Sequence, residues 1–103
     1  MAIDPNDIMI FETQVASGAD DVEEGPSGSV KVTSSDLELT TDGSKIQLIG
    51  IRFTDIDIPQ GATIVDAYIQ FQTEEASTGA VSLLIHGESS DDAAPFTGVR
   101  FDV

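Results

Sequence analysis

Short runs with apolar residues at every second position constrain the fold of this chain more than any other feature of its sequence. In SVKVT, residues 29–33, Val30 and Val32 share one face, and DLELT, residues 36–40, alternates in the same way. Successive side chains of a β-strand point to opposite sides of the sheet, so this spacing is typical of strands with one buried face. No stretch keeps the helical period. The sequence therefore predicts an all-β chain.

Turn-forming residues separate these runs. Asp42-Gly43 is a strong hairpin signal ahead of KIQLIGIRF, residues 45–53, and Gly50 inside that run indicates a bulge or bend. Gly61 can adopt a positive φ in a turn before the longest strand candidate, TIVDAYIQFQT, residues 63–73. Further apolar runs lie at residues 7–15, 80–88 and 96–103. We predict six to eight short strands in an antiparallel β-sandwich of jelly-roll type.

The charge of the chain excludes whole classes of partner. Nineteen acidic residues against four basic ones give a net charge of -15 over 103 residues. Such a surface repels nucleic acid and anionic membranes. Because 40% of the residues are hydrophobic, we expect a folded chain and not a disordered one. The length fits a single module, residues 1–103, with one modest core.

Targeting and cross-linking signals are sparse. The sequence has no cysteine, so neither a disulfide framework nor a thiolate metal site is expected. The longest apolar runs are too short to cross a bilayer, which argues against membrane insertion. The N-terminal MAIDPND, residues 1–7, has no basic or apolar region of a signal peptide. If the protein is exported, we expect its signal to have been removed.

Catalysis is not favoured by the residues present. The single histidine, His86, directly follows an apolar run, so we interpret it as a strand-end residue without a role. Paired carboxylates could hydrolyse glycosides, but a chain with no tryptophan and one tyrosine has little with which to stack a sugar. We therefore predict a protein that is not an enzyme, and a fragment of a polysaccharide-acting hydrolase is the alternative.

The stretch ADDVEEGPSG is the best candidate metal site. It holds four carboxylates in five positions next to a turn, and SSDLEL supplies two more on one strand face. Calcium is bound by six to eight oxygens, commonly of carboxylates and backbone carbonyls. The predicted ligands are Asp20, Asp21, Glu23, Glu24, Asp36 and Glu38. The alternative is a solvated acidic face that protects a sheet edge.

Arg52 is one of only four basic residues, and it lies between Ile51 and Phe53. It should therefore point away from those two side chains, toward the face that we expect to carry Asp36 and Glu38. We predict a cross-strand ion pair there, with ligand recognition as the alternative.

Several motifs together resemble a known type of module. The motifs are SGADDVEE, SSDLEL, IGIRFTDIDIPQGATIVDAYIQFQTEE and LLIHGE, and the match spans Gln14 to Glu88. They are similar to modules appended to large secreted or surface proteins of bacteria, of the carbohydrate-binding-like and DNRLRE type. The acidic loop, the Asp36 and Glu38 pair and Arg52 all match that pattern. The resemblance implies an extracellular or cell-surface β-sandwich beside catalytic or adhesive domains.

The end of the chain departs from that pattern, because such modules continue for several strands with tryptophans that this sequence lacks. We therefore expect a sandwich that lacks C-terminal strands or is completed by a strand of another chain, with FTGVRFDV, residues 96–103, as the exposed edge. The predicted function is that of a calcium-stabilised module for surface assembly or adhesion, through self-association or a protein partner, with a polysaccharide as a further candidate ligand.

Overall fold

The computed structural model of the chain describes residues 8–34, 36–76 and 78–103. Three parts of the sequence analysis fall outside the described residues: the heptapeptide MAIDPND, the first residue of the apolar run 7–15, and Ser35 of SSDLEL. The structure therefore does not bear on the absence of a signal peptide that we infer from MAIDPND. Within the described residues the chain forms strands and no helix. The strands are β1 (Asp21–Glu24), β2 (Val30–Lys31), β3 (Thr41–Asp42), β4 (Lys45–Ile46) and β5 (Leu48–Ile51). An antiparallel β structure is therefore present, as predicted, but the strand predicted at residues 36–40 is wrong, because these residues contain none.

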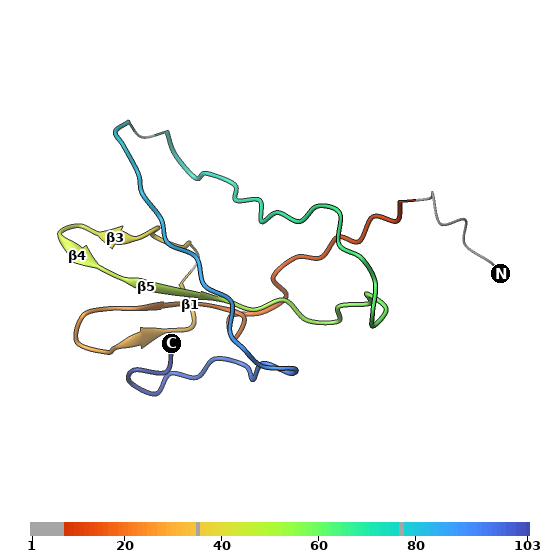
Figure 1. The fold of residues 1–103 in the computed structure, drawn as a ribbon. Helices are drawn as coiled ribbons and strands as arrows, with labels where there is room; N and C mark the ends of the chain where they lie inside the picture. Colours follow the sequence, from red (N-terminus) through yellow and green to blue (C-terminus); the bar gives the residue numbers. More distant parts are fainter. Residues whose placement is uncertain (1–7, 35, 77) are drawn as a thin grey trace.

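Three of these strands form one sheet in the order β2-β1-β5, and β3 pairs with β4 in a separate hairpin (Figure 1). All pairings are antiparallel. In the hairpin Thr41 lies opposite Ile46, and Gly43 has a φ of 60°. The hairpin predicted at Asp42-Gly43 is therefore present, with Gly43 and Ser44 as its turn residues because Asp42 pairs with Lys45. Strands this few and this short do not make up the two packed layers of a sandwich within the described residues.

The acidic stretch is the central strand of the sheet, and its interpretation as a loop is wrong. β1 pairs with β2 on one side and with β5 on the other, with Glu23 opposite both Lys31 and Ile49. Backbone pairing on both edges makes Asp21–Glu24 a strand whatever the preference of its side chains. Val22, the only fully buried hydrophobic side chain among the described residues, anchors β1 to the core.

Close packing around Gly50 forms that core. Gly50 lies opposite Val22 in the sheet, and the Phe96 ring covers it. A Cβ at Gly50 would stand 2.6 Å from Cζ of Phe96 and 3.0 Å from Cγ2 of Val22. The bulge predicted at Gly50 is therefore wrong, because the residue is paired in β5 and its missing side chain makes room for a ring from far along the chain.

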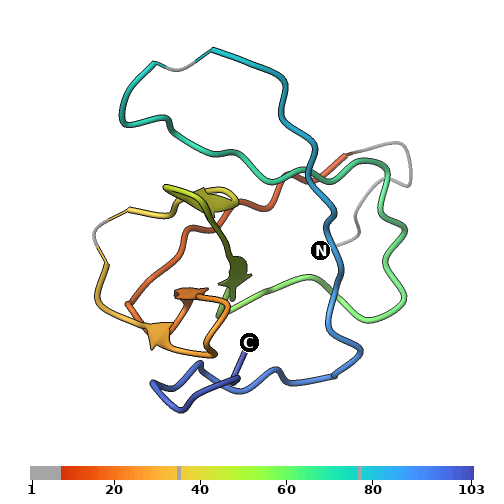
Figure 2. The same cartoon turned by 90° about the vertical axis from the view of Figure 1, so that its left-hand side faces the viewer.

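The C-terminal segment, residues 93–103, is held on the same part of the sheet. The Phe96 N–H donates to the Ala19 carbonyl at 2.9 Å, and the Phe101 N–H donates to the Gly28 carbonyl at 2.8 Å. The Arg100 guanidinium also donates to the Ser27 carbonyl. Figures 1 and 2 both show this end of the chain beside β1 and β2. The predicted exposed edge at residues 96–103 thus makes contacts within its own chain.

Residues 55–76 and 78–92 contain no strand, so the prediction of the longest strand at 63–73 is wrong for this structure. The turn before that run is present, because the Ala62 N–H donates to the Pro59 carbonyl at 3.1 Å and Gly61 has a φ of 83°. The run 63–73 then lies apart from the sheet, and residues 78–92 lead back to it, as both views show (Figures 1 and 2). The radius of gyration is 16.5 Å, whereas a compact domain of this length has about 13 Å.

Candidate functional site

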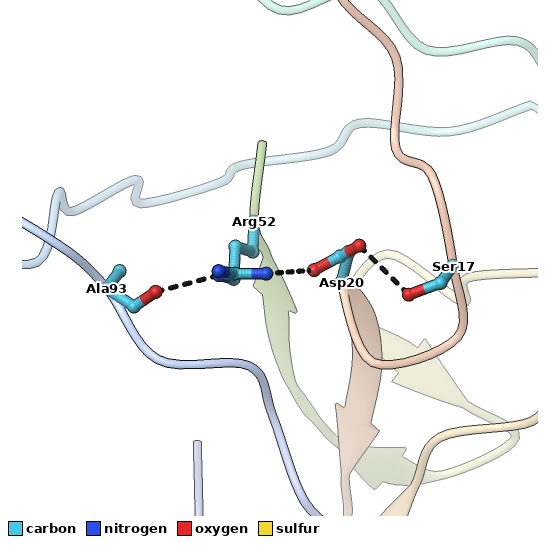
Figure 3. Close-up of polar contacts among 4 residues, drawn as sticks. All are labelled: Ser17, Asp20, Arg52 and Ala93. Atoms are coloured by element: carbon cyan, nitrogen blue, oxygen red, sulfur yellow. Dashed lines mark hydrogen bonds and ion pairs between the residues drawn. The ribbon is translucent and has the colours of Figure 1, made fainter. Parts of the chain in front are cut away.

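Asp20, directly before β1, and Arg52, directly after β5, form the best-defined polar site of the structure (Figure 3). Nη1 of Arg52 donates to Oδ1 of Asp20 at 2.8 Å, and its Nε donates to the Ala93 carbonyl at 2.8 Å. The Ser17 hydroxyl donates to Oδ2 of Asp20 at 2.9 Å. The Asp20 side chain is only 5% exposed and the Arg52 side chain 21%, so the carboxylate is shielded from solvent while the guanidinium is partly accessible. The pair ties β1, β5 and the C-terminal segment together.

The electrostatics of the site follow from this geometry. The hydrogen bond from Arg52 lowers the pKa of the Asp20 carboxyl, burial acts in the opposite direction, and the Ser17 hydroxyl lowers the pKa further. The carboxylate is therefore favoured in the folded chain. Arg52 does form an ion pair, but its predicted partners, Asp36 and Glu38, are wrong. The strand beside β5 is β1, which was not foreseen, so the acidic residue within reach of Arg52 is Asp20.

The other predicted ligands lie at different places around β1. Glu23 is buried, and its Oε2 accepts from the Glu38 N–H at 3.4 Å. Glu24 is also buried, and its Oε1 accepts from the Val103 N–H at 3.1 Å. Asp21 is half-buried, whereas Asp36 is exposed and accepts from the Ser34 hydroxyl at 3.1 Å. Alternation along the strand sends Glu23 and Glu24 to opposite faces of the sheet.

Metal binding stays a prediction from the sequence. In the described part of the chain, no group of three or more histidine, aspartate or glutamate side chains is placed to hold a metal ion. The two acidic segments do approach each other where Glu23 accepts from the Glu38 backbone, but Asp20 is engaged by Arg52.

Two pockets are lined in part by charged side chains. The larger, of about 490 Å³, is lined by Arg52 together with Asp55, Asp91 and Asp92. Its three carboxylates outnumber its single guanidinium, so it carries an excess of negative charge. The smaller, of about 170 Å³, is lined by side chains that include Glu23, Lys31, Lys45 and Gln47. At that volume it is below the 300–1,000 Å³ typical of pockets for drug-sized ligands.

A large exposed apolar surface is the feature that sequence reasoning missed. We call residues 63–73 and 80–86 the exposed segments. In the first of them Val65 is 74% exposed, Ile69 45% and Phe71 43%. In the second, Val81, Leu83, Leu84 and Ile85 are all exposed. The alternation was visible in the sequence, but it predicted buried faces, and the described chain covers neither segment.

These exposed segments are nearly free of charge. They contain one carboxylate, Asp66, and His86, in a chain whose net charge is -15. Acidic residues lie directly beside them at Glu74, Glu75 and Glu88. An uncharged apolar stretch bordered by charge is the usual composition of a protein-interaction surface.

Comparison of the chain with protein-family models, curated proteins and solved structures found no match. The resemblance to secreted bacterial modules therefore stays a prediction from the sequence motifs. Within the described residues, no helix has the length and apolarity needed to cross a membrane.

Proposed function

We propose that this chain is a non-catalytic β module that associates with another polypeptide through its exposed segments. The observation that carries the proposal is the surface area of the chain. A folded monomer of 10.9 kDa exposes about 5,600 Å², whereas this chain exposes 9007 Å². The excess of about 3,400 Å² is more than one partner's share, roughly 1,000–2,500 Å², of the surface that an obligate interface buries.

The sequence pattern supports the same proposal. A run with apolar residues at every second position is suited to a strand with one face against a core. In the exposed segments that face is accessible, so a partner that covers it adds the apolar contacts that the chain lacks. We propose that the completed form is the antiparallel β-sandwich predicted from the sequence, with its second layer built around residues 63–73 and 80–86.

The wider role follows from the predicted resemblance. Modules of that type belong to secreted or surface proteins, so we propose surface assembly or adhesion at an extracellular location. Calcium remains part of the proposal as a stabilising ion, because a net charge of -15 opposes compaction and a bound cation offsets part of it. Assembly is preferred to glycan binding or polysaccharide hydrolysis because the exposed segments are apolar and uncharged.

Small-angle scattering and light scattering of the purified chain test this proposal. We expect either a monomer with a radius of gyration near 16.5 Å or a complex of higher mass. An apolar dye should bind the monomer, and Ile69→Lys with Phe71→Lys should weaken that binding more than Ile10→Lys, a change at another exposed apolar residue. A monomer with a radius near 13 Å and no dye binding would refute the proposal, because it would have buried these segments itself.

A further inference from the structure

We infer that the partner of the exposed segments is an extended strand with alternating apolar and basic side chains, supplied by a different polypeptide. This inference rests on the proposed function, because it names what the interaction surface binds. It is carried by the unpaired backbone of residues 63–73, the spacing of the apolar side chains, and the distribution of charge.

The backbone of residues 63–73 is available for pairing. Among the described residues, no backbone hydrogen bond joins this run to any other part of the chain. Unpaired N–H and C=O groups in an extended segment are a template for strand addition. At about 3.3 Å per residue, eleven residues present roughly 36 Å of edge, which is longer than a common strand of five or six residues.

Side-chain spacing makes a strand a better partner than a helix. Val65, Ala67, Ile69 and Phe71 occupy alternate positions, and the positions between them hold the more polar Asp66, Tyr68 and Gln70. A strand presents its side chains with the same period of two, so its apolar side chains can lie beside these over the whole run. A helix contacts an apolar surface at intervals of three and four residues and would match only part of it.

Charge selects a basic partner over a second copy. The segment contains one charge, Asp66, but Glu74 and Glu75 follow it and Asp55 and Asp57 precede it. Two copies would bring two chains of net charge -15 together. A strand with lysine or arginine between its apolar residues would instead be attracted by those carboxylates while its apolar side meets the uncharged face.

Peptide binding measured by fluorescence anisotropy tests the inference. The probe is a labelled peptide of about ten residues in which valine alternates with lysine. A block peptide, with the same valines and lysines in two runs, controls for charge. A third peptide alternates valine with glutamate, and a fourth has every second amide of the Val-Lys peptide N-methylated. We expect the alternating Val-Lys peptide to bind at least about tenfold more tightly than each of the other three.

Variants of the chain locate the site. Ile69→Lys should weaken binding of the alternating peptide by about tenfold, whereas Ile10→Lys should leave it unchanged. Both residues are exposed in the free chain, so neither change removes a buried contact. Equal binding of the block peptide, or an equal effect of the two variants, would overturn the inference.

The outcome also separates this inference from the proposed function. A stable dimer that ignores the peptide would overturn the basic strand as partner and leave the interaction role intact. A compact monomer that binds no peptide would overturn both.

Discussion

Replacing Gly50 by alanine tests the packing that holds the sheet together. Gly50 lies in β5, opposite Val22 of β1, with the Phe96 ring above it. A new Cβ would stand 2.6 and 2.8 Å from two atoms of that ring, whereas ordinary van der Waals contacts are 3.4–4 Å. The ring must therefore move away by about 0.6–0.8 Å. That movement disturbs the segment that brings Phe96 to the core.

The expected cost is the difference between two effects. Overpacking of a core typically costs about 1–3 kcal/mol. Gly→Ala also restricts the unfolded chain, which stabilises the protein by about 0.4–1 kcal/mol. We therefore expect Gly50→Ala to lower the free energy of unfolding by about 1–2 kcal/mol. For a domain of this size that corresponds to a fall of roughly 4–16 °C in Tm.

Thermal and urea unfolding followed by circular dichroism measure this cost. Gly87→Ala is the matched control, because no atom lies within 4 Å of its new Cβ, and we expect a change within about 0.5 kcal/mol. In the background of Phe96→Leu, whose side chain is more flexible, the cost of Gly50→Ala should shrink. An unchanged stability of Gly50→Ala, or an equal cost in both backgrounds, would refute the packing described for this site.

Further predictions concern the charged groups and the predicted metal. Arg52→Met should lower the unfolding midpoint, because it leaves the Asp20 carboxylate shielded from solvent without its partner. Arg52→Lys should lower the midpoint less than Arg52→Met does. Equal midpoints for the parent and Arg52→Met would contradict this prediction. Since the pKa of Asp20 lies below its ordinary value of 3.8 in the folded chain, its stabilisation is present above about pH 4 and is lost as the pH falls below that. Asp20→Asn should remove this part of the acid dependence, and an identical pH profile would argue against it. If calcium stabilises the fold, millimolar calcium should raise Tm and a chelator should reverse the rise. The double variant Asp20→Asn, Glu23→Gln should show no such response. An unchanged Tm of the parent chain in calcium would refute the metal hypothesis.

Local features of the fold were predictable from the sequence. The hairpin signalled by Asp42-Gly43 depends on the backbone freedom of neighbouring residues, and in the structure Asp42 of β3 pairs with Lys45 of β4 there. The turn at Gly61 was predictable for the same reason. In both cases the residues that determine the conformation are adjacent in the chain.

Features that depend on distant residues were not predictable. Nothing in DDVEE indicates a central strand, because its two neighbours, β2 and β5, determine its pairing. The partner of Arg52 was not predictable for the same reason, because choosing between Asp20 and Asp36 requires knowing which strand lies beside β5. Phe96 could not be assigned to Gly50 either, because 45 residues separate them in the sequence.

The exposed segments show a different limit of sequence reasoning. Alternation in residues 63–73 predicted a strand with a buried face, but it does not say which polypeptide covers these apolar side chains. The charge distribution supplies part of this missing information. The carboxylates lie beside the exposed segments and not among their apolar side chains. The net charge of -15 therefore opposes association between copies, while the apolar contact surface itself carries no charge. One distribution of charge can therefore keep separate chains apart before assembly and favour a basic strand when one is present.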